Sequence, residues 1–142
     1  MKTVKQLLDT KQVQIFSVRE QISVLDALKV MTEKNISALL VMEGNQLSGI
    51  FTERDYARKI ILHGKSSKDT LIKEAMTANP IAIKMTDSID YCMELMTDKH
   101  IRHLPVVENN EVKGMVSIGD VVKFIIADQK QTISQLESYI SG

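Results

Sequence analysis

The sequence predicts an α+β fold built from two copies of one unit, each with the order strand, helix, strand, strand, helix (β-α-β-β-α). A seven-residue motif leads to this prediction because it occurs twice, at residues 49–55 and 114–120, with the copies 65 residues apart. Each copy reads glycine, two apolar residues, a hydroxyl residue, two variable residues and aspartate. Flanking positions match at the same offset, for example Met31-Thr32 with Met96-Thr97. Internal similarity at a fixed offset indicates a duplicated unit of about 60 residues.

Apolar periodicity and turn residues define the elements of the first copy. Apolar residues that recur every three to four positions predict amphipathic helices, and short apolar runs beside turn residues predict strands. The stretch Glu43-Gly44-Asn45-Gln46 is typical of a hairpin turn. The predicted elements are a helix over 3–9, a strand over 13–18, a helix over 23–34, hairpin strands over 38–42 and 47–51, and a helix over 53–62.

The second copy repeats this order after a polar linker over 63–68. Its predicted elements are a helix over 71–76, a strand over 81–83 after the turn Asn79-Pro80, a helix from 87 or 88 to 99, hairpin strands over 103–107 and 112–117, and a helix over 118–128. A last amphipathic helix over 131–140 has no counterpart in the first copy. Such a helix needs a surface to cover, either its own module or a second chain.

Composition excludes several classes of function. The chain has 142 residues, and its 18 basic and 18 acidic residues give a formal net charge of +0, so nothing favours non-specific binding to nucleic acid or to an acidic membrane. No apolar run approaches the roughly 20 residues that span a bilayer, and residues 1–6 lack a signal-peptide core. The single Cys92 excludes an intramolecular disulfide. A cytoplasmic protein is therefore expected.

The two copies are expected to fold together. One unit exposes a sheet face that it cannot bury alone, whereas two units stacked face to face can bury both. We expect repeats at residues 1–66 and 67–142, with the terminal helix in the second, forming a single module. Stacking around a pseudo-two-fold axis predicts clefts between the repeats.

Both copies of the motif combine a hydroxyl residue with an aspartate three positions later. Thr52 with Asp55, and Ser117 with Asp120, fit the spacing of a helix capping box, which alone would explain each motif. The alternative is ligand contact, since a carboxylate can accept both hydroxyls of a ribose. The two roles are compatible.

A run of basic residues follows the first motif. Arg54 and Arg58 are four apart and share a helix face, with Lys59 beside them. A solvated face or an Asp55–Arg58 ion pair would explain the run. A phosphate clamp is the functional alternative, because arginine binds phosphate through two parallel hydrogen bonds.

With these features assembled, the chain resembles a CBS-domain pair, also called a Bateman module. The resemblance covers nearly the whole chain and is based on the two motifs, residues 101–107 and the order of elements in both copies. Residues 51–59 and 115–122 are similar to small stand-alone CBS-pair proteins in particular.

The resemblance implies a non-catalytic regulatory module that binds an adenosine-containing ligand such as AMP, ADP, ATP, NAD or S-adenosylmethionine. It also implies a homodimer and a regulated partner protein whose identity is unknown. Carried onto this chain, the implied ligand-binding residues are Thr52, Arg54, Asp55, Arg58, Lys59, Pro80, Ile81, Arg102, His103, Ser117, Ile118, Gly119 and Asp120.

The copies differ at two places where the family contacts its ligand. The first copy has Ser37-Ala38 where the second has Arg102-His103, and Gln12-Val13 where the second has Asn79-Pro80. This difference puts the phosphate contacts of the first copy in doubt, and two unequal clefts are expected. Arg102 and His103 are adjacent, so on a strand they would point to opposite faces.

Two other classes of function are alternatives to a nucleotide-binding module. A protein-interaction or oligomerisation scaffold that binds no nucleotide would need the motifs only as helix caps. An enzyme is not predicted, since the sequence shows no nucleophile–base pair and no glycine-rich NTPase loop. The three histidines have no metal-ligand spacing with Cys92, which aligns with Ala27 on an apolar helix face and is expected to be a small buried residue.

Overall fold

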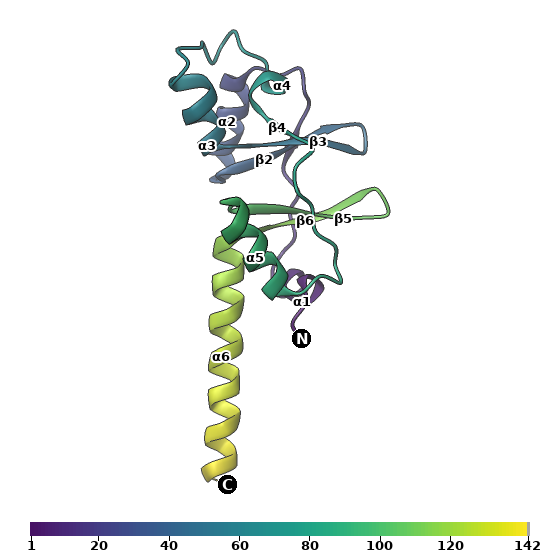
Figure 1. Cartoon of the computed structure of the whole chain (residues 1–142), viewed down its shortest axis with the longest axis vertical. Helices are drawn as coiled ribbons and strands as arrows, with labels where there is room; N and C mark the ends of the chain where they lie inside the picture. Colours follow the sequence, from purple (N-terminus) through teal and green to yellow (C-terminus); the bar gives the residue numbers. More distant parts are fainter. Residues whose placement is uncertain (142) are drawn as a thin grey trace.

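The computed structural model describes residues 1–141 and contains two repeats followed by one long helix (Figure 1). The first repeat and the segment before it contain α1 (Val4–Asp9), β1 (Ser17–Val18), α2 (Val24–Lys34), β2 (Ala38–Glu43), β3 (Gln46–Thr52), α3 (Glu53–Asp55) and the π-helix η1 (Tyr56–Ile61). The remainder contains α4 (Ile72–Ala75), β4 (Thr77–Ala78), α5 (Ile89–Lys99), β5 (His103–Glu108), β6 (Glu111–Ser117) and α6 (Ile118–Ser141).

The two hairpins have the same register, which confirms the duplication. In the first, β2 and β3 pair antiparallel with Ala38 opposite Thr52, and in the second, β5 and β6 pair with His103 opposite Ser117. Each hairpin strand that carries a motif therefore ends at the motif's hydroxyl residue, where a helix begins. The first hairpin lies in a four-stranded sheet of order β1-β2-β3-β4, and the second forms a two-stranded sheet.

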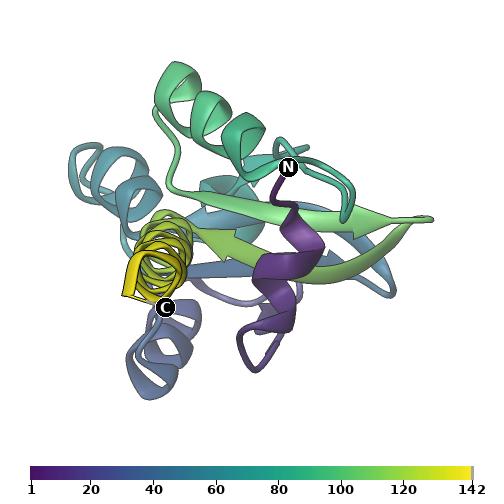
Figure 2. The same cartoon turned by 90° about the horizontal axis from the view of Figure 1, so that it is seen from below.

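Each hairpin is covered by helices that bury an apolar core. The first core joins α2, β2, β3, η1 and α4, with Phe51 and Ile72 fully buried. The second joins α1, α5, β5, β6 and the start of α6, with Leu7 and Leu104 almost fully buried. Packing therefore crosses the predicted division at residue 66, because α1 packs into the second core and α4 into the first. Figure 2 shows α1 lying against the β5–β6 hairpin.

The repeats meet through the outer faces of their hairpins. Ala38, Leu40 and Ile50 of the first hairpin form a separate apolar cluster, and Val112 and Met115 of the second pack against it. This contact lets each hairpin bury one face against its own helices and the other against its neighbour. The predicted stacking of two units around a shared interface is confirmed.

Two predicted strands are shorter or displaced. The strand expected over 13–18 is paired only at Ser17–Val18, and the one expected over 81–83 is replaced by β4 at Thr77–Ala78. Ile83 forms a single bridge with Val106. An apolar run indicates that a segment is buried but does not show which of its residues pair with another strand. Here residues 79–81 line a cavity instead.

Two predicted helices also differ. The helix expected over 53–62 becomes a π-helix after its first turn, with Leu62 N–H donating to the Ala57 carbonyl at 3.0 Å, a spacing that side-chain periodicity does not reveal. The helices expected over 118–128 and 131–140 form one continuous helix. No proline or glycine separates them, and Gln129, Lys130 and Gln131 favour helix. Within residues 1–141, no helix is both long and apolar enough to cross a membrane.

Candidate functional site

A cavity of about 1160 Å³ lies between the repeats, beside the first motif. Its volume is somewhat larger than the usual range for small-molecule sites. The first repeat contributes the motif and its following helix, and the second contributes the segment after β4, the end of α5 and the start of β5. The lining residues are Ser37, Ile50, Thr52, Glu53, Arg54, Asp55, Arg58, Lys59, Thr77, Asn79, Pro80, Ile81, Met96, Thr97, Lys99, His100, Ile101, Arg102 and His103.

The first motif closes a complete capping box at the edge of this cavity. Thr52 N–H donates to the Asp55 carboxylate at 3.0 Å, and Asp55 N–H donates to the Thr52 hydroxyl at 3.1 Å. The other Asp55 oxygen accepts from the Thr77 hydroxyl at 3.0 Å and lies 3.2 Å from Lys59 Nζ. Asp55 is 9% exposed, so its carboxylate is largely committed to contacts within the protein. The alternative Asp55–Arg58 ion pair does not form; Lys59 takes that place.

A close backbone approach brings Thr77 to this carboxylate. A Cβ on Gly49 would lie 2.7 Å from the Thr77 carbonyl oxygen, nearer than real Cβ atoms approach, so β4 can pair beside β3 only because residue 49 is glycine. The glycine that opens the motif therefore allows the second repeat to reach the aspartate that ends it.

Five basic side chains line the cavity against two acidic ones, which gives it an electropositive wall. Two of the five are held by the protein: Arg54 donates to the His100 carbonyl, and Lys59 donates to the Met76 carbonyl at 3.1 Å as well as pairing with Asp55. The other three (Arg58, Lys99 and Arg102) are exposed, and none forms a hydrogen bond or ion pair within the described part of the chain. Three cations are therefore free to meet an anion.

Arg102 and His103 both line the cavity, contrary to the expectation that they point to opposite faces. Strand β5 begins only at His103, so strand alternation does not apply to Arg102. His103 Nε2 lies 3.2 Å from the Ser37 hydroxyl, which links the repeats. Burial lowers the pKa of His103 and nearby Arg102 lowers it further, while Asp120 and Glu53 oppose the shift, so the ring is neutral at pH 7.

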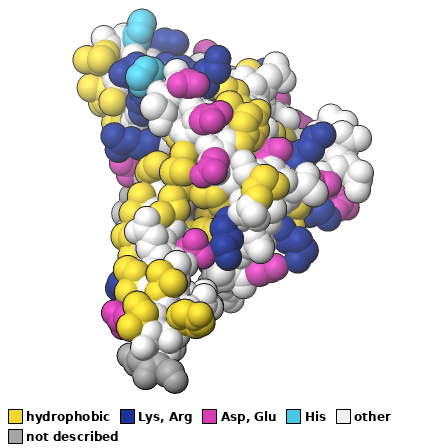
Figure 3. Space-filling view, turned by 60° about the horizontal axis from the view of Figure 1, so that its bottom comes forward, with side chains coloured by type: hydrophobic (Ala, Val, Ile, Leu, Met, Phe, Trp, Pro, Cys, Tyr) yellow, Lys and Arg dark blue, Asp and Glu magenta, His cyan; other side chains and the backbone are white. Residues whose placement is uncertain are grey.

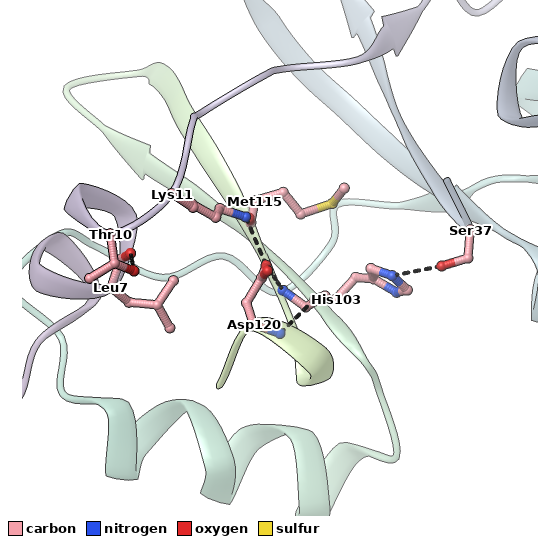
Figure 4. Close-up of polar contacts among 8 residues, drawn as sticks. Leu7, Thr10, Lys11, Ser37, His103, Met115 and Asp120 are labelled. Carbon is pink, nitrogen blue, oxygen red and sulfur yellow. Dashed lines mark hydrogen bonds and ion pairs between the residues drawn. The ribbon is translucent and has the colours of Figure 1, made fainter. Parts of the chain in front are cut away.

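The second motif has a different environment (Figure 4). Ser117 and Asp120 form the same pair of capping bonds, at 2.9 and 3.1 Å. Lys11, from the segment after α1, places Nζ 2.7 Å from the Asp120 carboxylate and 2.9 Å from the Met115 carbonyl oxygen. Burial opposes the ionisation of Asp120, but the hydrogen bonds and charge of Lys11 and the bonds of Ser117 outweigh it, so the pKa of Asp120 is lowered.

The segment that carries Lys11 is fixed by packing against the second hairpin. A Cβ on Gly114 would lie 3.3 Å from Val13 Cγ1 and 3.4 Å from Leu8 Cδ2, tighter than most such contacts. The two motif glycines thus serve the same purpose, because each lets a distant segment pack against its hairpin. Residues 76–77 pack at Gly49, and Leu8 and Val13 pack at Gly114. In the first motif that segment supplies a threonine hydroxyl, and in the second it supplies an ammonium group.

The structure brings together nine of the thirteen predicted site residues. The nine that line the cavity are Thr52, Arg54, Asp55, Arg58, Lys59, Pro80, Ile81, Arg102 and His103. The other four, Ser117, Ile118, Gly119 and Asp120, line neither this cavity nor a second one of about 290 Å³ near the hairpin ends.

The grouping of these residues by repeat needs correction. Arg102 and His103 line the cavity beside the first motif, although the offset groups them with the second copy. The sequence reasoning also missed Lys11, Thr77 and Lys99, which reach the motifs only through the packing of the two repeats. Cys92 is fully buried as expected, and burial together with the charge of Asp87 raises its pKa to about 11. In residues 1–141 no group of histidine, cysteine and acidic side chains is arranged to hold a metal ion.

Two stacked hairpin repeats with a basic cleft between them define a paired-repeat module. The chain belongs to the CBS-domain family, whose profile matches residues 4–62 and 72–127. The CBS domain-containing protein CBSX3, mitochondrial, of Arabidopsis thaliana is 44% identical over 125 residues, which cover 84% of this chain and 61% of that protein. The CBS domain-containing protein YhcV of Bacillus subtilis is 30% identical over 113 residues, 80% of each chain.

Solved structures agree with this assignment. A putative signal-transduction protein with CBS domains from Burkholderia ambifaria is 47% identical, with a TM-score of 0.86 over 90% of this chain and 96% of that one. CBSX2 in complex with AMP has a TM-score of 0.75 over 91% of this chain and 99% of that one, and at 22% identity it shows likeness of fold alone. The fold is therefore two tandem CBS repeats with a C-terminal helix.

Proposed function

We propose that this chain is a non-catalytic regulatory module that binds one adenine nucleotide tightly, in the cavity beside the first motif. The observation that supports it is the cavity itself, whose lining includes the free cations Arg58, Lys99 and Arg102 and the apolar residues Pro80 and Ile81. An apolar wall suits a planar base, and guanidinium groups suit phosphates. AMP, ATP and NAD are the proposed ligands. The AMP found with CBSX2, a protein of the same fold, is consistent with this choice.

Asp55 is proposed to contact the ribose, in addition to capping the helix. Both of its oxygens are already engaged, so a ribose diol would have to replace the contact from Thr77 or that from Lys59. Lys59, released from Asp55, would then be available to a phosphate. If the diol replaces Thr77 instead, ligand binding would rearrange a contact between the repeats, which is how a nucleotide could favour one arrangement of the module.

The second motif is proposed to bind nucleotide more weakly. A ribose at Asp120 must displace Lys11, which holds the carboxylate at 2.7 Å. The neighbours of this motif also offer less charge, since Ser37 and Ala38 stand where the other cleft has Arg102 and His103. Ser117, Ile118, Gly119 and Asp120 remain proposed contacts of this weaker site.

The output is proposed to pass to a regulated protein or through assembly, with a homodimer as the resting state. The predicted repeat boundaries, residues 1–66 and 67–142, and the predicted cytoplasmic location remain proposals, and the relative CBSX3 is mitochondrial by name. Because the chain spans 61% of CBSX3, the partners of that longer protein are not assumed here.

A nucleotide-independent scaffold is the second candidate. It is favoured by one observation: Asp55 and Asp120 are both satisfied by protein groups. Thermal shift against AMP, ATP, ADP, NAD and S-adenosylmethionine separates the two. A ligand at 100 times its dissociation constant adds about 2.7 kcal/mol to the free energy of unfolding, a clear rise in melting temperature. No rise with any of these ligands, for protein freed of bound nucleotide, would favour the scaffold.

A further inference from the structure

Helix α6 begins as part of the second core and then leaves it. Val121 is buried, and Phe124 and Ile125 pack against the core formed by α1, α5 and the β5–β6 hairpin. Further along, an ion pair of 3.3 Å between Lys2 and Asp128 joins the helix to the body. Beyond it the helix projects from the module (Figure 1).

The projecting half carries an apolar stripe. Ile133 is 55% exposed, Leu136 57% and Ile140 83%, and these side chains follow Val122 and Ile126, both nearly half exposed. Figure 3 shows apolar side chains running down α6. A helix of this length without tertiary contacts is marginal in water, so the projecting half needs a partner surface.

The spacing of the stripe identifies the kind of partner. Ile126, Ile133 and Ile140 recur every seven residues, and Leu136 follows Ile133 by three, as the a and d positions of a coiled coil do. Val122 extends the d series toward the body, and Gln129 occupies the d position between. In parallel coiled coils, isoleucine at a with leucine at d favours two strands, and a single polar residue in the seam specifies the register.

We propose that α6 pairs in parallel with α6 of a second copy of this chain, in register, through the stripe Val122, Ile126, Gln129, Ile133, Leu136 and Ile140. In this arrangement each stripe residue meets its own counterpart, and Gln129 can hydrogen-bond to Gln129 of the other copy. No like charges oppose each other, since Lys130 faces Ile125 and Glu137 faces Thr132 at the flanking positions. An antiparallel pair centred on residue 131 would set Val122 opposite Ile140 and would place Gln129 opposite Ile133, so the two amides would not meet.

The proposal gives the proposed homodimer a specific interface and does not depend on nucleotide binding. A parallel pair places both CBS modules at the same end of the coiled coil, side by side. Ligand titration could therefore refute nucleotide binding without refuting this interface, and a monomeric protein would refute the interface without refuting nucleotide binding.

The test is the mass of the full chain in solution, by light scattering or analytical ultracentrifugation. Wild type is expected at twice the chain mass. The double variant Ile133→Glu/Leu136→Glu should be monomeric, and Gln131→Glu/Ser134→Glu, which adds the same charge on the outer face, should stay dimeric. A monomeric wild type would overturn the proposal, as would a double variant that remains dimeric.

Orientation is tested by oxidation of an Ile140→Cys variant with oxidised glutathione. In a parallel pair the two introduced thiols meet, and a covalent dimer should form in high yield. The native Cys92 is fully buried and should give no background in wild type. In an antiparallel pair residue 140 lies opposite Val122, about 27 Å along the helix axis from residue 140 of the partner copy. Failure to cross-link a dimeric variant would therefore overturn the parallel arrangement.

Discussion

Removal of the ion pair between Lys11 and Asp120 should lower the stability of the fold and raise the affinity of the second motif for nucleotide. The Lys11→Met variant keeps the aliphatic stem and removes the charge. Both side chains are about one-quarter to one-third exposed (31% and 25%), and the pair is 2.7 Å apart. A hydrogen bond between charged groups is worth roughly 1.5–3 kcal/mol, and partial exposure favours the low end. We expect the free energy of unfolding to fall by about 1.5 kcal/mol.

The same variant should bind nucleotide more tightly at the second motif. If Lys11 must leave Asp120 before a ribose can enter, its removal lowers the cost of binding by about the same 1.5 kcal/mol, roughly a tenfold decrease in the second dissociation constant. Urea unfolding measures the first effect, and two-site calorimetric titration with ATP measures the second. The tight site beside Asp55 serves as the internal reference, because its affinity should not change.

A double-variant cycle with Asp120→Asn isolates the pair. Lys11→Met and Asp120→Asn should couple by about 1 kcal/mol or more, whereas independent sites add to within about 0.5 kcal/mol. Additive losses, or a second-site affinity that falls in Lys11→Met, would refute the reasoning. The latter result would mean that Lys11 contacts the ligand rather than competing with it.

Three further predictions concern other groups. The pKa of Asp120 is lowered in the folded protein, so ionised Asp120 stabilises the fold fully above its ordinary pKa of 3.8, and this stabilisation is lost as the pH falls below that value. The difference in the free energy of unfolding between wild type and Asp120→Asn, measured by urea titration, should therefore shrink from pH 6.5 to pH 3. His103 is neutral at pH 7, and a bound phosphate should favour its protonation. The affinity for ATP should therefore rise more from pH 7.5 to pH 5.5 in wild type than in His103→Gln. Equal pH profiles in the two proteins would place the ring away from the phosphates. Asp55→Ala should lower the melting temperature even without ligand, because it removes a cap worth on the order of 1 kcal/mol together with the Lys59 contact; an unchanged melting temperature would contradict the capping role.

The duplicated motif was enough to predict most of the fold. A fixed offset gives the order of elements, and both hairpins have the predicted turns and both motifs the predicted caps. Local pairing of this kind depends on residues close in sequence, which is why the residues alone could predict it. Strand ends were less predictable, because β4 exists only where the backbone of residue 77 can approach Gly49.

The composition of the two clefts could not be predicted from the offset. Alignment of the copies places Arg102 in register with Ser37, and this suggested that the first copy lacked a phosphate contact. In the structure Arg102 lines the same cavity as Asp55, because this cleft draws residues from both repeats. Lys11 had no visible role in the sequence, since its partner Asp120 is 109 residues away.

The central claim is that the cavity beside Asp55 binds an adenine nucleotide through its free cations. Calorimetric titration of ATP and AMP into wild type, Arg58→Ala/Arg102→Ala and Arg19→Ala tests it directly. Arg19 is an exposed arginine outside the cavity and serves as the matched control. At about 1 kcal/mol for each exposed arginine, the double variant should lose roughly 25-fold in ATP affinity and less for AMP, with Arg19→Ala unchanged. Equal ATP affinity in all three proteins would contradict the account.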